Sequence, residues 1–288
     1  MRLRRAPLPQ ALIDQARAFD SGMATPAEPR NAATVVLLRD GDSGPEVYLL
    51  RRQTSMAFAG GMCVFPGGGV DPRDFSEDLD DDPTWSGPSV ADWATTLGCE
   101  PHLARALVCA AVRETFEESG VLLAGPTADT VVSDTTGDDW EADRVALESR
   151  ELSMSDFLDR RGLVLRTDLL GAWSGWLTPV FEPRRYRTWF FAALLPEGQH
   201  ARDVSSESSS VTWLPAMDAV AAVEDGEMLM LPPTYLTCLD VGQHASVAEV
   251  LVEAGQRTVE MFTPEVVSTG EDFTLSTPPL YEALLESR

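Results

Sequence analysis

The stretch RETFEESGV, residues 113 to 121, decides the fold of this chain. In a helix, Glu114, Glu117 and Glu118 stand at positions i, i+3 and i+4 and project from one face. Like charges at that spacing repel each other and weaken an isolated helix, so their presence indicates a cation between them. Hard carboxylate oxygens are the ligands that Mg²⁺ and Mn²⁺ prefer. The alternative interpretation of the cluster is a helix face exposed to solvent.

The surroundings of the acidic cluster favour a binding site over a solvated face. Arg113 lies four residues before Glu117, where its guanidinium can hold that carboxylate in one orientation. Residues 103 to 112 (LARALVCAAV) are apolar and rich in alanine, which is typical of a helix packed on a core. Gly120 can end that helix in a left-handed conformation. We therefore expect a buried helix whose acidic end lies at the rim of the core.

A glycine-rich segment, FPGGGVDPRD, lies upstream at residues 65 to 74. Without Cβ atoms, residues 67 to 69 let the backbone approach a ligand more closely than other residues would. An ordinary tight turn is the alternative, but the acidic helix that follows favours a loop that binds a ligand.

Together the two segments resemble the signature of the Nudix hydrolases. Residues 113 to 121 match its second half, except that Thr115 replaces an aliphatic residue. Residues 65 to 74 match its first half, with Gly68 and Asp74 at the expected separation. The signature expects seven residues between the acid and the arginine, whereas residues 75 to 112, a total of 38, intervene here.

The extra residues indicate an insertion at about residues 75 to 104, rich in Asp, Glu, Pro and Gly. This composition predicts a solvated excursion between loop and helix rather than additional core. A split signature resembles one Nudix branch, which includes a peroxisomal coenzyme A diphosphatase and many bacterial relatives. The segments WLTP (176 to 179), RYRTWFF (185 to 191) and LPPT (231 to 234) also resemble that branch, although Arg187 replaces its usual aspartate.

The resemblance implies a metal-dependent pyrophosphohydrolase that uses Mg²⁺ or Mn²⁺. It implies that the Gly67 carbonyl, Glu117 and Glu118 bind the metal, with Glu114 as a further ligand or a proton acceptor. Bound divalent ions lower the pKa of water and neutralise phosphate oxygens. The general base stays open between a helix glutamate and Glu207, which lies on the polar loop 205 to 210 and has a plain surface glutamate as its alternative interpretation.

Substrate identity depends on the arginines and on the same resemblance. Arg52 and Gly61 match part of a pattern in coenzyme A-cleaving Nudix enzymes, although Ala57 stands where a second basic residue is usual. Arg184 and Arg185 belong to a basic cluster suited to phosphate contact, or else they balance an acidic surface. Gly68 would also contact the substrate.

We expect coenzyme A or an acyl-coenzyme A as the substrate of this site. The alternatives are another nucleotide, such as ADP-ribose, NADH, a nucleotide sugar or a dinucleoside polyphosphate, and a Nudix module that senses ligands or partners without hydrolysis. The intact set of Arg113 and three glutamates favours the enzyme, because a retired site has no physical reason to keep clustered carboxylates.

Composition narrows the range of partners. The chain has 288 residues, a net charge of −24 and no lysine, which disfavours binding to nucleic acid or to anionic membranes. Its four cysteines form no Cys-x-x-Cys pair, and no apolar run is long enough to span a membrane. We expect a cytoplasmic protein with a small nucleotide substrate, and the sequence leaves a homodimer open.

The order of expected elements predicts an α/β (α+β) sandwich with a mixed sheet. We expect an N-terminal helix and linker (1–30), a Nudix domain (31–240) and a C-terminal extension packed on it (241–288). Expected helices span residues 8–20, 103–119, 143–160, 215–225 and 245–255, and expected strands span 33–39, 46–51, 62–66, 177–181, 186–195 and 210–214.

Overall fold

The computed structural model describes residues 8, 10–22, 24–56, 59–76, 82–269 and 272–287. Ala57 and the acidic run at positions 77 to 81, both part of the sequence argument, lie outside these residues. None of the described helices has the length and apolar character needed to cross a membrane.

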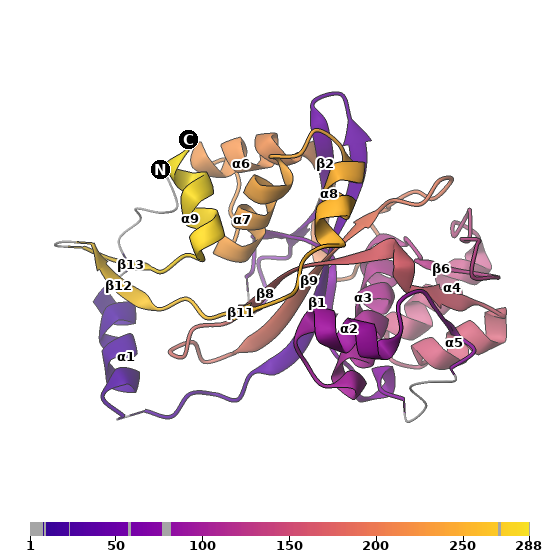
Figure 1. The fold of residues 1–288 in the computed structure, drawn as a ribbon, viewed down its shortest axis with the longest axis horizontal. Helices are drawn as coiled ribbons and strands as arrows, with labels where there is room; N and C mark the ends of the chain where they lie inside the picture. Colours follow the sequence, from indigo (N-terminus) through magenta and orange to yellow (C-terminus); the bar gives the residue numbers. More distant parts are fainter. Residues whose placement is uncertain are drawn as a thin grey trace.

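A mixed sheet forms the centre of the molecule, as the sequence predicts (Figure 1). Its strand order is β10-β2-β1-β9-β8-β11, with β3 paired to β2 and β4 paired to β1. β1 pairs with β9 in parallel and β8 with β11 in parallel, and the other pairs are antiparallel. The strands are β1 (Arg30–Gly41), β2 (Gly44–Arg52), β3 (Cys63–Val64), β4 (Gly67–Gly69), β8 (Leu170–Leu177), β9 (Tyr186–Leu194), β10 (Ser208–Pro215) and β11 (Met261–Phe262).

Helices cover both faces of this sheet. Alternate residues of β1 point to opposite faces, so Val35 and Leu37 enter one core cluster while Val36 and Leu38 enter the other. The first cluster contains residues of α2 (Val90–Leu97), α3 (Pro101–Ser119), α4 (Asp138–Glu148) and α5 (Met154–Arg161). The second contains residues of α6 (Ala216–Glu224), α7 (Pro232–Val241), α8 (Val247–Ala254) and α9 (Pro279–Glu286). The result is the expected α/β/α sandwich.

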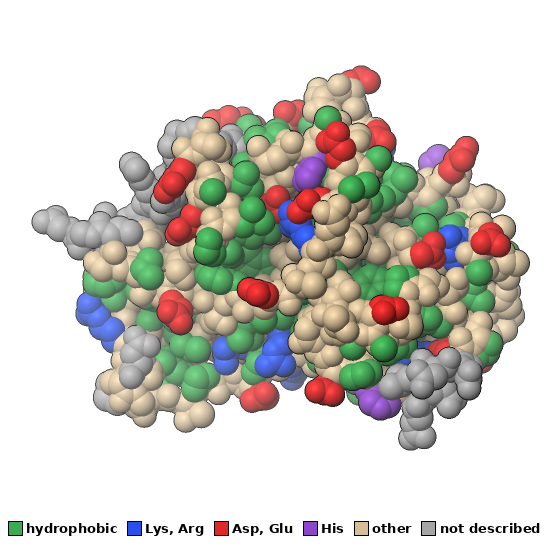
Figure 2. All heavy atoms as spheres, viewed as in Figure 1, with side chains coloured by type: hydrophobic (Ala, Val, Ile, Leu, Met, Phe, Trp, Pro, Cys, Tyr) green, Lys and Arg blue, Asp and Glu red, His purple; other side chains and the backbone are tan. Residues whose placement is uncertain are grey.

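Smaller elements surround the sandwich. A three-stranded sheet joins β5 (Trp85–Ser86), β7 (Val164–Arg166) and β6 (Ala124–Gly125), and β12 (Val266–Thr269) pairs with β13 (Asp272–Leu275). The 3₁₀ turns η2 (Pro72–Asp74) and η3 (Thr167–Leu169) precede the insert and β8. Helix α1 (Gln10–Asp20) lies beside the β12–β13 hairpin, where the Arg17 guanidinium stands 5.3 Å from the Phe273 ring (Figure 1). Acidic side chains are scattered over the face shown in Figure 2 rather than gathered in one patch.

The acidic helix α3 has the predicted position and ends. Pro101 occupies its first turn, where the missing N–H is no loss, and Gly120 closes it with a φ of 73°. Its small side chains let it lie close against the sheet, and Ala104, Ala110 and Ala111 are fully buried. The sequence prediction for this helix is confirmed.

The insert corrects one prediction. Its second half is not a solvated excursion, because α2 packs on α3 with Trp93 and Leu97 in the core. Asp82, at the start of the described insert, pairs with the buried Arg105 of α3. Helix α2 is short and mixes small polar residues with large apolar ones. The overall composition of the insert therefore does not reveal that one face of this helix is apolar.

The segment expected to form one helix at 143–160 forms two, α4 and α5. Ser153 accepts a hydrogen bond from the Asp156 amide and begins α5, while Arg150, with a φ of 63°, follows the end of α4. The Ser153 cap therefore starts a new helix, although the apolar pattern of the segment continues across it.

The strand expected at 177–181 lies earlier, at β8. Gly171 and Gly175 interrupt the apolar pattern of β8, and such a pattern is not typical of a strand. An added Cβ on Gly171 would lie 2.5 Å from the Ala254 Cβ, and one on Gly175 would lie 2.7 Å from Val259 Cγ1. These glycines leave space for α8 and the segment that follows it to lie against the sheet.

The C-terminal residues form more structure than the expected helix at 245–255 and β-rich tail. Helix α9 packs on the second core through Tyr281, whose ring stacks on Trp176 at a centroid distance of 5.9 Å. Phe262 contacts the same indole edge-on at 5.6 Å. Helix α7, which begins at the LPPT segment, was also missed, because its two prolines resemble a loop.

Candidate active site

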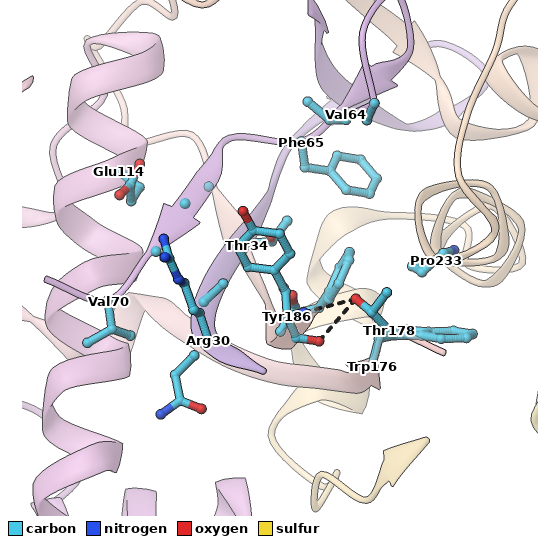
Figure 3. Close-up of a pocket in the computed structure, with 18 of the residues that line it drawn as sticks. Arg30, Thr34, Val64, Phe65, Val70, Glu114, Trp176, Thr178, Tyr186 and Pro233 are labelled. Atoms are coloured by element: carbon cyan, nitrogen blue, oxygen red, sulfur yellow. Dashed lines mark hydrogen bonds between the residues drawn. The ribbon is translucent and has the colours of Figure 1, made fainter. Parts of the chain in front are cut away.

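A cavity of about 1150 Å³ lies between α3, the glycine strand β4 and the first turn of α7 (Figure 3). Figure 3 shows Glu114 projecting from α3 at one side of the cavity, with Trp176 and Pro233 at the other. The predicted residues that line it are Arg52, Gly67, Gly68, Arg113, Glu114, Glu117, Glu118 and Glu207. The structure therefore gathers in one place residues that come from four separate parts of the sequence.

The glycine strand lies directly against the acidic face of α3. The Gly67 amide donates a hydrogen bond of 2.8 Å to Glu118 Oε2. A Cβ on Gly68 would stand 2.5 Å from Glu114 Oε2, and a Cβ on Gly67 would overlap the Ala33 carbonyl oxygen on β1. Glycine is therefore required at position 67 by the backbone of β1, whereas a side chain at position 68 would displace the end of the Glu114 side chain.

Arg113 joins the two halves of the split signature. Its Nε and Nη2 donate hydrogen bonds of 2.9 Å each to the two carboxylate oxygens of Asp74, at the end of η2. Its Nη1 also donates to Glu114 at 2.8 Å and to Glu117 at 3.1 Å. The predicted contact of Arg113 with Glu117 is confirmed. The structure also shows a bidentate contact of Arg113 with Asp74, which was not predicted. Asp74 is 1% exposed, so the pair is shielded from water.

The acidic face of α3 carries more negative charge than its surroundings neutralise. Burial raises the pKa of the Glu114 carboxyl to about 7, in spite of the neighbouring Arg113 guanidinium. Burial likewise raises the pKa of Glu117, and it raises that of Glu118 well above its usual range, with the Glu114 charge adding to the effect. Two buried carboxylates and one partly buried carboxylate next to one guanidinium are a site that a cation would stabilise.

The donor set fits a hard divalent cation. Glu114, Glu117 and Glu118 supply carboxylate oxygens from one helix face, and the Gly67 backbone contacts Glu118. Within the described part of the chain, however, no three His, Cys, Asp or Glu side chains converge closely enough to hold a metal ion, and Arg113 contacts both Glu114 and Glu117. The chemistry of the donors fits Mg²⁺ or Mn²⁺, while their side chains are arranged around an arginine.

Arg52 and Glu207, two residues predicted separately, form an ion pair at the cavity wall. Arg52 Nη2 lies 2.8 Å from Glu207 Oε2, and the Glu207 side chain is 50% exposed. The charge of Glu207 also contributes to the raised pKa of Glu118, which places the loop residue near the acidic face. Glu207 is thus within the cavity rather than on a distant surface.

The basic cluster predicted for substrate binding does not line the cavity. Arg185 is buried, and its guanidinium donates to the carbonyl oxygens of Thr178 and Ala27, each at 3.1 Å. Arg184 is exposed outside the cavity, and Arg187 contacts the Asn31 side chain at 3.3 Å. Arg184 and Arg185 lie in the connection between β8 and β9 and only Arg187 lies on a strand, so proximity in sequence did not bring these guanidinium groups to one site.

Five charged residues that line the cavity were not predicted as site residues, and Glu148 and Arg30 are two of them. Glu148, at the end of α4, accepts hydrogen bonds from the Ser206 amide and hydroxyl and from Arg144. Arg30 begins β1, and its guanidinium points into the cavity beside Tyr186 (Figure 3). Neither belongs to a motif. The only sequence signal was their charge, which many surface residues share.

Comparisons with known proteins agree with this geometry. Residues 99–239 match the family model of the NUDT19 Nudix domain. The chain is 26% identical over 267 residues to the acyl-coenzyme A diphosphatase NUDT19 of Xenopus laevis, covering 81% of this chain and 70% of that protein. It is 28% identical over 209 residues to the putative nudix hydrolase 7 of Caenorhabditis elegans, covering 71% of this chain and 57% of that one. A crystal structure of a NUDIX hydrolase from Alicyclobacillus acidocaldarius superposes with a TM-score of 0.65 at 25% identity, over 81% of this chain and 99% of that one.

The sandwich, the acidic helix and the glycine strand, together with these likenesses, support a member of the Nudix hydrolase superfamily. The same likenesses support a hydrolase that acts on pyrophosphate bonds. Within the superfamily, it resembles the acyl-coenzyme A diphosphatases of the NUDT19 type.

Proposed function

We propose that the chain is a divalent-metal-dependent hydrolase of coenzyme A or acyl-coenzyme A, which forms 3′,5′-ADP and phosphopantetheine or its acyl derivative. The observation that carries this proposal is the contact of the Gly67 strand with the acidic face of α3 inside one large cavity. That contact holds the Gly67 backbone against the Glu118 carboxylate in the wall of a cavity large enough to admit a pyrophosphate.

The metal ligands proposed are Glu117, Glu118 and the Gly67 carbonyl, with Glu114 as a further ligand. A bound divalent ion would supply an activated water and neutralise charge on the phosphate oxygens. Arg113 acts through these residues rather than on the substrate, because it holds Glu114 and Glu117 while Asp74 fixes its own position.

Two carboxylates lie where they can accept the proton of the attacking water. Glu207 is half exposed and held by Arg52, so water reaches it from the open side of the cavity. Glu114 lines the same cavity, against Gly68. Comparing Glu207→Gln with Glu114→Gln in single-turnover experiments assigns the role, because loss of the base slows chemistry even when metal and substrate are saturating.

Arg30 is the proposed substrate-binding cation, in place of Arg184 and Arg185. Arg52, Arg113 and Arg150 also line the cavity, and each contacts a carboxylate. The ion pairs of the described residues include none for Arg30, so its charge is available to a phosphate group. The similarity to the acyl-coenzyme A diphosphatase of Xenopus laevis further supports a substrate with several phosphates.

The test is product analysis with coenzyme A, acyl-coenzyme A, ADP-ribose, NADH, nucleotide sugars and diadenosine polyphosphates, each with Mg²⁺ or Mn²⁺. We expect 3′,5′-ADP from coenzyme A substrates, and no product after metal removal by EDTA. Glu117→Gln should lower kcat by about a thousandfold or more while the circular dichroism spectrum stays unchanged. Glu227→Gln, an exposed substitution outside the cavity, is the matched control.

The same panel separates the alternatives. Turnover of another nucleotide alone would retain the mechanism and replace the substrate. No turnover with either metal, together with metal-independent binding of a panel member, would favour a ligand-sensing module.

A further inference from the structure

The cavity has two ends of different chemistry. At one end stand the acidic face of α3 and the Gly67 strand, and at the other stand the indole of Trp176 and the ring of Pro233 (Figure 3). Phe65 and Phe190 continue the apolar end and contact each other edge-on at 6.4 Å. We call this apolar end of the cavity, lined by Phe65, Trp176, Phe190, Pro233, Pro264 and Leu275, the apolar arm.

The C-terminal segment completes the wall of this arm. Pro264 and Leu275 both line the cavity, although they lie beyond the residues matched by the family model. Leu275 ends β13 and pairs with Val266 on β12. Trp176 is held in place by Phe262 and Tyr281, which come from the same segment. The C-terminal segment therefore supplies part of the wall of the arm and supports Trp176.

Two polar side chains near the arm, those of Trp176 and Thr178, are already engaged. Trp176 Nε1 donates to the Ser174 hydroxyl at 3.2 Å. Thr178 Oγ1 accepts from the Tyr186 amide at 3.0 Å and donates to the Tyr186 carbonyl oxygen at 3.2 Å. An adenine would need polar partners for the edge of its base, whereas a hydrocarbon chain needs only apolar walls.

We propose that the apolar arm binds the acyl chain of an acyl-coenzyme A and that Leu275 and Pro264 set the preferred chain length. This inference depends on the proposed function for the position of the pyrophosphate at the acidic end. A substrate with its pyrophosphate at α3 and a long flexible linker has an apolar tail to place, and the arm is the apolar end of the same cavity. Free coenzyme A leaves these walls in contact with water, so the acyl ester binds more tightly.

The experiment compares KM for coenzyme A, octanoyl-coenzyme A and hexadecanoyl-coenzyme A in the full chain. Leu275→Trp adds bulk to the arm, and we expect it to raise the KM ratio of octanoyl-coenzyme A to coenzyme A by about tenfold or more. Val267→Trp, on the paired strand but outside the cavity and 38% exposed, is the matched control and should leave this ratio unchanged.

A smaller change covers the case in which Leu275→Trp fails to fold. Leu275→Ala enlarges the arm, so the ratio of kcat/KM for hexadecanoyl-coenzyme A to that for octanoyl-coenzyme A should rise. Ratios equal to those of the wild type in every folded Leu275 variant would overturn the proposal.

Failure of the proposed function would give a different result. If no coenzyme A compound is hydrolysed, calorimetric Kd values for coenzyme A and octanoyl-coenzyme A decide the matter. Tighter binding of the acyl form that Leu275→Trp or Leu275→Ala abolishes would support the arm without the hydrolase. Equal affinity for both, or no binding, would overturn it.

Discussion

Arg113 makes several contacts in the site, and its position in the sequence predicted only one of them. Its spacing predicted the contact with Glu117, since residues four apart on a helix are neighbours. Its strongest contact, the bidentate pair with Asp74, spans 39 positions and could be placed only through the resemblance between the split signature and the family's continuous one. An insertion of unknown path leaves such a distance undetermined until the chain is folded.

At the residue scale, we expect Asp74→Asn to lower the free energy of unfolding by about 3 kcal/mol, because it leaves a buried guanidinium without its main counter-charge. Asp139→Asn is the control. Its carboxylate is 68% exposed and pairs with Arg161, so the loss should be only a small fraction of that for Asp74→Asn. Urea unfolding followed by circular dichroism measures both. Equal effects of the two variants would contradict a structural role for the Asp74–Arg113 pair.

Strand β4 shows how a local pattern can have a cause outside the site. Three glycines before an acidic helix predicted a close backbone approach to a ligand, and the structure shows them close to two protein elements, α3 and β1. The sequence did not predict that the glycines are themselves a strand. Pairing with Ala32, Ala33 and Thr34 depends on how β1 is placed in the sheet, which no local pattern specifies.

At the element scale, Gly67→Ala should destabilise the protein by about 1–3 kcal/mol, since its Cβ would meet the backbone of Ala33 and Thr34. Gly69→Ala is the matched control on the same strand. Its added Cβ would have no atom within 4 Å, and we expect a change of no more than about 0.5 kcal/mol. Thermal unfolding of both variants checks this. A Gly67→Ala protein as stable as Gly69→Ala would show that β4 shifts without cost.

The insert and the C-terminal segment show that the molecule is more than a Nudix core with attachments. Trp93 of the insert helix contacts Phe191 of the central sheet at 5.9 Å, and Tyr281 of α9 stacks on Trp176. Both segments therefore contribute side chains to the hydrophobic core, which the composition of the insert and of the C-terminal segment did not predict. The expected cytoplasmic location and the homodimer stay predictions.

At the scale of the whole molecule, Trp93→Ala should lower the free energy of unfolding by about 3–5 kcal/mol, because the side chain is buried in the first core cluster. Thr95→Ala, exposed on the same helix, should change it by no more than about 0.5 kcal/mol. Denaturant unfolding compares the two. A small effect of Trp93→Ala would restore the interpretation of the insert as a solvated excursion.

The sequence by itself determined the class of the protein, the acidic face of α3 and the glycines beside it. These features follow from helical spacing, from a short motif and from the conformational freedom of glycine, all of which act over a few residues. Only the tertiary structure decided that Arg30 and Glu148 line the cavity while Arg184 and Arg185 do not, and that Leu275 closes its apolar arm. Burial and charge pairing depend on which distant segments pack together. That packing depends on contacts throughout the folded chain, which no local pattern specifies.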